Sequence, residues 1–198
     1  MSIPFSQLLQ MSVASYANAE DLLKDAEVLF AAERWARTLF LCQIAAEEMA
    51  KSLLSLWAAV RVRLGEFDAA QETRYRDCLC NHKMKTATLQ AIEDFFWTAR
   101  SIVDLKQSVS RNEIIRRDSD IANHEKIKLS ALYADLDGDG AFCPGRFFST
   151  ADKVGLDLKL AQRRMELFRA NVPPLFGVMG NCDIEQCRIW MNNLGPLL

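Results

Sequence analysis

The sequence predicts an all-α protein, and three observations lead to this fold class. Apolar residues recur at spacings of three and four along most of the 198 residues, which is the period of an amphipathic helix. No stretch of useful length alternates apolar and polar residues as a half-buried strand does. Helix stop and cap signals, such as Gly65 and Ser149 or Thr150, delimit the periodic stretches. We therefore expect one domain, residues 1–198, built as a bundle of about five to seven helices.

Two long helices open the chain. The apolar pattern predicts the first from about Ser6 to Glu33 and the second from about Trp35 to Leu64, where Gly65 stops it. Because the connection between them is so short, we expect these two helices to run antiparallel. A third helix starts near Asp68 and extends, with a bend, to about Trp97.

The second half of the chain is less regular. Residues 102–132 are helical in pattern but highly charged, and they form one helix or two. Residues 133–149, rich in Asp, Gly and Pro, predict an irregular loop. A further helix, capped by Ser149 or Thr150, reaches about Ala170. The segment 171–198, with a short helix over 183–192, is more apolar than an exposed tail and is expected to dock on the domain or on a second subunit.

Composition narrows the class of protein. Half of the residues are hydrophobic and a quarter are charged, which is typical of a folded chain and not of a disordered one. The net charge is −2, so a nucleic-acid partner would have to be held by a local basic patch. The N-terminus lacks the basic region and cleavage site of a signal peptide, and six cysteines without an export signal indicate free thiols. We expect a cytoplasmic protein that does not enter a membrane.

The second helix carries charges where its neighbours are apolar. Glu47, Glu48 and Lys51 lie at the centre of the stretch LFLCQIAAEEMAKSLLSLW, residues 39–57. Glu47 and Lys51 are four residues apart and share a helix face, so we expect them to form a semi-buried pair. Removing one partner of a buried pair costs about 3–5 kcal/mol, which suggests that a third group shares this site.

The best third group lies in RYRDCLCNHKMK, residues 74–85. This stretch holds His82, with Arg76 six residues before it and Lys85 three residues after it. A histidine beside basic residues, with carboxylates on a neighbouring helix, is suited to general acid–base chemistry.

Metal and cofactor sites are not expected. DLDGDGAFCPGR resembles the first half of a calcium loop, but Arg146 occupies the twelfth position, where a glutamate should bind the ion. Cys78 and Cys80 lack the spacing of a zinc finger and diverge on a helix.

Four sequence elements together resemble the AbiV-type abortive infection proteins, which are bacterial anti-phage proteins with a HEPN-like helical domain. They are an Asn-Ala in the first helix, a Glu-Glu-x-x-Lys in the second, a His-x-x-Lys, and a Leu-Tyr-x-Asp before a proline-containing loop. Their order and approximate spacing hold across about residues 15–150. In this chain they are Asn18-Ala19, Glu47, Glu48 and Lys51, His82 and Lys85, and Leu132, Tyr133, Asp135 and Pro144.

The resemblance implies two functions, which stay open at this point. Many HEPN proteins are metal-independent ribonucleases with an Arg-x(4–6)-His signature. Arg76 with His82 satisfies this signature, and so does Arg117 with His124. We favour the first pair, because His82 also belongs to the His-x-x-Lys element.

In the ribonuclease interpretation, His82 acts as acid or base when a ribose 2′-OH attacks the adjacent phosphate. Arg76, with Lys85 or Lys83, neutralises the phosphoryl oxygens, and Glu47 or Glu48 orients the imidazole. The site would lie across a homodimer and act on RNA.

In the second interpretation, the same residues form a catalytically inert polar clasp between the second and third helices. The protein is then a dimeric binding module that blocks translation by contact with a phage or host protein. In both interpretations it is an effector that shuts down protein synthesis, and a phage-encoded activator protein is a candidate partner.

Overall fold

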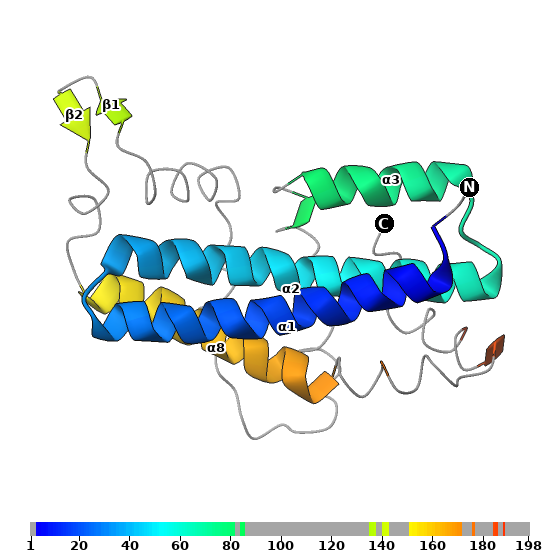
Figure 1. Ribbon diagram of the computed structural model, residues 1–198, viewed down its shortest axis with the longest axis horizontal. Helices are drawn as coiled ribbons and strands as arrows, with labels where there is room; N and C mark the ends of the chain where they lie inside the picture. The colour runs from blue at the N-terminus through cyan, green and yellow to red at the C-terminus, as the bar shows by residue number, and fades with distance from the viewer. Residues whose placement is uncertain are drawn as a thin grey trace, which may run out of the picture.

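The computed structural model describes residues 3–81, 84–85, 135–137, 140–142 and 151–171, together with positions 176, 184, 185 and 188. These residues form a helical bundle, which confirms the predicted all-α class. Helix α1 (Phe5–Ala31) and helix α2 (Trp35–Leu64) run antiparallel over their whole length, as Figure 1 shows. Helices α3 (Ala69–Cys80) and α8 (Ala151–Asn171) pack beside α2.

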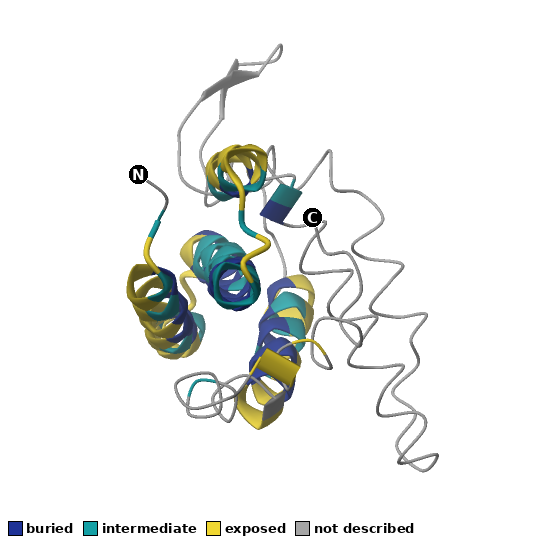
Figure 2. Cartoon of the chain, turned by 90° about the vertical axis from the view of Figure 1, so that its right-hand side faces the viewer, coloured by how far each residue is buried: buried dark blue, intermediate teal, exposed yellow. Residues whose placement is uncertain are grey.

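Helix α2 is the centre of the bundle. Viewed along the bundle, α1, α3 and α8 surround it (Figure 2). All nine residues from Ser52 to Val60 are buried, so no side of the helix faces solvent at this level. Trp57 is the largest of these buried side chains. This helix therefore forms the core, and the other elements are arranged by what they cover on it.

The first two helices end in the same way. At the end of α1, Glu33 N–H donates to the carbonyl of Phe30 and Arg34 N–H to that of Leu29, at 3.0 and 2.9 Å. The same pair of bonds follows α2, where Gly65 adopts a φ of 72°. This is the arrangement in which a left-handed residue satisfies the last carbonyls of a helix. Glycine suits the left-handed position because it has no Cβ. After α1, however, this position is occupied by a glutamate, Glu33, with a φ of 59°.

Buried hydroxyl groups join α2 to its neighbours. Ser12 of α1 donates to the carbonyl of Ser52 at 2.7 Å, and both serines are fully buried. On the α3 side, the Ser55 and Tyr75 hydroxyl oxygens lie 2.8 Å apart. These two hydroxyl contacts each cross a helix interface, and they help to fix the axial register of α1 and α3 on α2.

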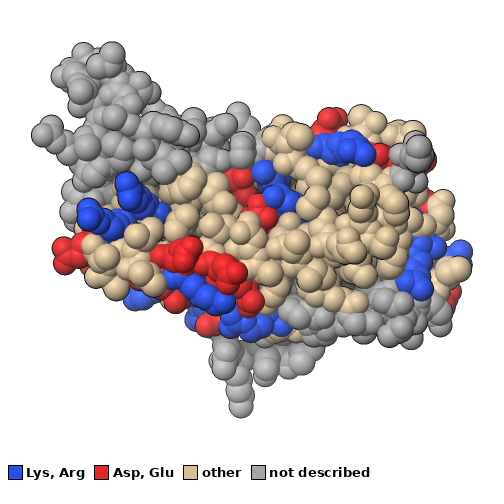
Figure 3. Space-filling model, in the orientation of Figure 1, with Lys and Arg blue, Asp and Glu red and all other residues tan. Residues whose placement is uncertain are grey.

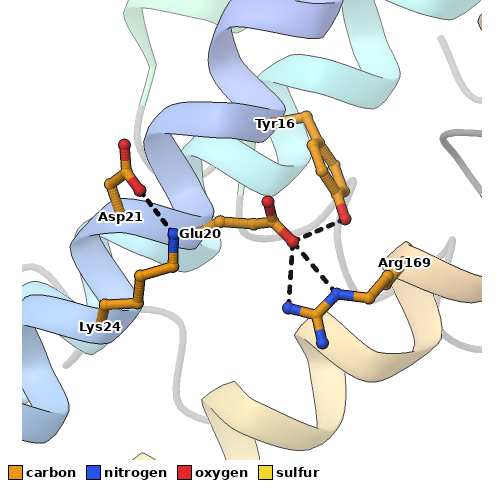
Figure 4. Close-up of polar contacts among 5 residues, drawn as sticks. All are labelled: Tyr16, Glu20, Asp21, Lys24 and Arg169. Atoms are coloured by element: carbon orange, nitrogen blue, oxygen red, sulfur yellow. Dashed lines mark hydrogen bonds and ion pairs between the residues drawn. The ribbon is translucent and has the colours of Figure 1, made fainter.

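Helix α8 closes the bundle against α1. Arg169 donates from two nitrogens to one carboxylate oxygen of Glu20, at 3.0 and 3.1 Å, and the Tyr16 hydroxyl donates to the same oxygen at 3.0 Å (Figure 4). The ring of Tyr16 also meets Phe176 edge to face, with 6.0 Å between ring centroids. Phe176 thus places one residue of the 171–198 segment on the domain.

Most of the predicted element boundaries agree with the structure, and two differences matter. Helix α3 ends at Cys80, and Met84 and Lys85 are again helical, so Asn81 interrupts the third helix, which was predicted to run with a bend to about Trp97; residues 86–97 lie outside the described part of the chain. Within the predicted loop 133–149, β1 (Asp135–Asp137) and β2 (Gly140–Phe142) form a short antiparallel ribbon in which Leu136 pairs with Ala141. The helix predicted over 102–132 lies outside the described residues.

Candidate functional site

The two adjacent carboxylates of α2 have different partners. The ion pair recorded for Lys51 is made with Glu48, three residues before it on the helix. The sequence predicted a pair of Lys51 with Glu47 instead, four residues away. The side chains of Lys51 and Glu48 are 25% and 13% exposed, so this pair lies at the edge of the core. On α2 the carboxylate of Glu47 is therefore directed to another cation.

That cation is Lys85. Its Nζ lies 3.1 Å from Oε2 of Glu47, and the two side chains are only 8% and 12% exposed. Glu47 belongs to α2, whereas Lys85 follows α3 along the chain, so the pair crosses from one helix to the next. The predicted contact between the Glu-Glu-x-x-Lys and His-x-x-Lys elements is present at these two residues.

Asn81 is the residue that brings Lys85 to this position. It ends α3, because its N–H donates to the carbonyl of Asp77 at 3.0 Å while its own backbone is extended. It also starts a new helical turn. Its side-chain oxygen accepts from Met84 N–H at 3.3 Å, and its carbonyl accepts from Lys85 N–H at 3.1 Å. An asparagine cap of this kind fixes the direction in which the next helix leaves.

Arg76 lies on a different side of α3. Its guanidinium donates from two nitrogens to Glu72 of the same helix, at 2.8 and 3.1 Å, and its side chain is 60% exposed. Glu72 also accepts a hydrogen bond from the backbone N–H of Ile3, at 3.3 Å. The neighbouring Arg76 guanidinium holds the pKa of the Glu72 carboxyl below its usual range. Sequence analysis overlooked Glu72, although its spacing of four residues from Arg76 is the signal of such a pair.

The histidines cannot be placed relative to these residues. His82, His124 and Arg117 all lie outside the described residues. Among the predicted site residues, the structure therefore pairs Glu47 with Lys85 and Glu48 with Lys51. The guanidinium of Arg76 lies on the exposed surface of α3.

Two linked hydroxyl groups, of Ser55 and Tyr75, connect α2 to α3 one helical turn after Lys51. Sequence analysis did not predict them. Ser55 donates to the carbonyl of Lys51 at 2.8 Å and is joined to the hydroxyl of Tyr75. Burial raises the pKa of the Tyr75 hydroxyl above its usual value of 10.0, so this group stays protonated and can keep its hydrogen bond. These hydrogen bonds connect α3 to the helical turn that carries Lys51.

Chemically, the four charges form two ammonium–carboxylate pairs with no net charge. Such pairs can hold helices together, and they offer little attraction to a phosphate because each cation already faces a carboxylate. Among the described residues, no group of three His, Cys, Asp or Glu side chains could hold a metal ion. In the same part of the chain, no helix is both long and apolar enough to cross a membrane.

Comparison with known proteins gives one result. No curated protein and no solved structure matches the chain. The family model of AbiV, a HEPN family, matches residues 7–164, and this range includes most of α1, all of α2 and α3, and about two thirds of α8. The matched range covers well over half of the sequence, so the chain belongs to the AbiV family of HEPN-like abortive infection proteins.

Proposed function

We propose that this protein is an abortive infection effector that shuts down protein synthesis by binding a phage or host protein, as a homodimer in the cytoplasm. Its membership of the AbiV family supports a role in abortive infection. The observation that favours binding over catalysis is the pairing of charges. Lys85 faces Glu47 and Lys51 faces Glu48, while Arg76 is held by Glu72 on the outside of α3.

The Glu47–Lys85 pair then acts as a clasp. It joins α2 to the turn that follows α3, and both of its side chains are almost completely buried. A buried ion pair costs free energy to desolvate, and apolar residues often replace it without loss of stability. In this proposal the clasp keeps the α3 region in place for a partner, and no proton transfer involves it.

A metal-independent endoribonuclease is the second candidate, and one observation favours it. Asn81 breaks the helix immediately before His82 and caps the turn that carries Lys85. His82 follows Asn81 directly in the sequence, and in HEPN ribonucleases the Arg-His motif generally lies near a helix start. RNA would then be the substrate, with His82 and Lys85 at the reacting phosphate.

One set of variants separates the two candidates. Protein synthesis and total RNA would be followed in cells that express the wild type, His82→Ala, or the double variant Glu47→Leu/Lys85→Met, with and without phage infection. Lys24→Met is the matched control, because Lys24 forms an exposed ion pair with Asp21 far from the clasp.

Under the binding proposal, synthesis stops with intact RNA in the wild type, and both His82→Ala and the folded double variant still stop it. RNA fragments with 2′,3′-cyclic phosphate ends that vanish in His82→Ala would overturn the proposal and establish the nuclease. The same purified proteins, incubated with RNA in excess EDTA, would show whether the cleavage needs a metal.

A further inference from the structure

The Glu48–Lys51 pair joins no two elements of the bundle. Both residues belong to α2 and lie three positions apart, whereas the Glu47–Lys85 pair crosses from α2 to the turn after α3. A pair at this spacing adds little to the stability of a helix, and partial burial offsets some of that gain because both charges lose water. The fold therefore does not account for these two charges in an otherwise apolar part of α2.

Both side chains keep hydrogen-bonding capacity that the described residues do not use. The Lys51 ammonium has three N–H groups, and it donates to Oε1 of Glu48. Within the described part of the chain, no other contact is recorded for this ammonium or for Oε2 of Glu48. The two side chains are 25% and 13% exposed, so an outside group can reach them. The pair thus offers a donor and an acceptor side by side.

These charges lie in a hollow of the surface. Figure 3 shows blue and red atoms set back among uncharged ones, where Figure 1 places the middle of α2 and the end of α3. Glu47, Glu48 and Lys51 are the charged residues in this part of α2, and Lys85 reaches it from the turn after α3. Because two carboxylates and two ammonium groups cancel, the hollow favours neither an anion nor a cation. It suits a neutral group that is both a donor and an acceptor.

We infer that Glu48 and Lys51 bind the side-chain amide of an asparagine or glutamine on the partner protein. This inference rests on the proposed function, which supplies that partner. A primary amide carries an N–H donor and a C=O acceptor on the same side of one plane. The amide N–H faces the Glu48 carboxylate, and the amide oxygen faces the Lys51 ammonium. A single backbone peptide does not fit, because the N–H and C=O of a trans peptide point in opposite directions.

The test compares variants that remove the pair with one that exchanges its members. Glu48→Leu/Lys51→Met and the exchange variant Glu48→Lys/Lys51→Glu would be expressed over a range of levels, with and without phage infection. Glu47→Leu/Lys85→Met is the matched control, because it removes a pair of the same kind from the neighbouring position of α2. Incorporation of labelled methionine measures protein synthesis, and urea unfolding of the purified proteins measures stability.

The amount of Glu48→Leu/Lys51→Met that halves protein synthesis should be about tenfold or more above the wild-type amount, because two hydrogen bonds to the partner are lost. Its urea midpoint should match that of the wild type, since the pair joins no two elements. The exchange variant should arrest synthesis again, because an amide turned by half a rotation exchanges its donor and its acceptor. The control should arrest synthesis as the wild type does.

Arrest by folded Glu48→Leu/Lys51→Met at the wild-type amount would overturn the inference, and so would a folded exchange variant that does not arrest. Should the apolar variant misfold, Glu48→Lys alone is the second variant. It removes the acceptor but keeps a long polar side chain, and the same loss is expected of it.

Total RNA from the same cells separates this inference from the proposed function. Intact RNA with arrest that does not depend on Glu48 and Lys51 refutes the amide contact alone. RNA fragments with 2′,3′-cyclic phosphate ends in the wild type refute the binding proposal itself.

Discussion

Lys85 reaches back to Glu47, with 3.1 Å between Nζ and Oε2, across the boundary between two helices that the chain visits one after the other. The contact depends on Asn81, which ends α3 and starts the turn on which Lys85 lies. Asn81 thus positions the helical turn from which the ammonium group of Lys85 reaches Glu47.

Removal of the Lys85 ammonium should destabilise the fold strongly. Lys85→Met leaves the Glu47 carboxylate facing a thioether in a nearly dry position, and the free energy of unfolding should fall by about 3–5 kcal/mol. The double variant Glu47→Leu/Lys85→Met should unfold within about 1 kcal/mol of the wild type, because both charges are gone. Urea unfolding followed by circular dichroism measures all three.

Lys24→Met controls for the loss of a lysine from an exposed pair, for which only a small loss of stability is expected because solvent screens the pair. If Lys85→Met were no more costly than this control, Lys85 would lie in solvent and the clasp would not exist.

Glu33 is expected to reduce the stability of the fold, and its replacement by glycine is expected to increase it. Its φ of 59° places a side chain in the left-handed region, which costs about 1–2 kcal/mol for an L residue. Glycine relieves this strain, but it costs more conformational entropy to fix on folding, which offsets part of the gain. Glu33→Gly should therefore raise the free energy of unfolding by about 0.5–1 kcal/mol. Thermal unfolding would show this as a higher melting temperature.

Gly65 provides the reverse experiment. It holds the equivalent position after α2, and a Cβ added there would meet nothing within 4 Å. Gly65→Ala should therefore destabilise through backbone strain alone, by about 1 kcal/mol. Changes of the same sign at the two positions would contradict this explanation.

Acid should weaken the contact of Arg76 with Glu72 in a predictable direction. The pKa of Glu72 is lowered below its ordinary value of 4.5, first by the hydrogen bond from Arg76. A carboxyl whose pKa is lowered in the folded state contributes stability above pH 4.5, and this contribution is lost as the pH falls through the lowered pKa. Glu72→Gln should thus be less stable than the wild type at pH 7, and the difference should shrink toward pH 3.

Urea midpoints at several pH values measure this convergence. Glu66→Gln is a suitable control, because Glu66 is exposed and no ion pair is recorded for it in the described part of the chain. A difference between Glu72→Gln and the wild type that persists unchanged in acid would mean that the ionised carboxylate is not what Arg76 binds.

The described cysteines should differ in reactivity. Burial raises the pKa of the Cys42 thiol to about 12, and burial also raises that of Cys78. Cys80 is exposed at the end of α3. Because the thiolate is the reactive form, iodoacetamide at pH 8 should modify Cys80 and spare the two buried thiols until the protein unfolds. Peptide mass spectrometry of native and urea-treated protein would measure this, and rapid native labelling of Cys42 would contradict its burial.

Sequence analysis predicted the long helices well because their signals are local. The bounds predicted for the second helix, Trp35 to Leu64, are those observed, since a strong apolar period ends at a glycine that adopts the left-handed conformation. The position of the break in the third helix, after Cys80, could not be predicted from its period. Asn81 stops the helix through backbone and side-chain bonds to the next turn, and asparagine is compatible with either outcome in the sequence alone.

The candidate site was predicted only in part, for a related reason. Spacing along α2 allows Lys51 to meet either Glu47 or Glu48, and the choice depends on Lys85, which another helix delivers. Spacing likewise suggested Arg76 as a partner of His82, but Glu72 on the same helix holds its guanidinium. Contacts between helices depend on how the helices are rotated, which the local pattern does not determine. The roles of His82, His124 and Arg117 stay predictions.

The burial of α2 from Ser52 to Val60 on all sides has a consequence for how the molecule opens. These amides lie in a helix that α1, α3 and α8 enclose, so local fraying cannot expose them to solvent. Their hydrogens should exchange with deuterium only when the whole domain unfolds.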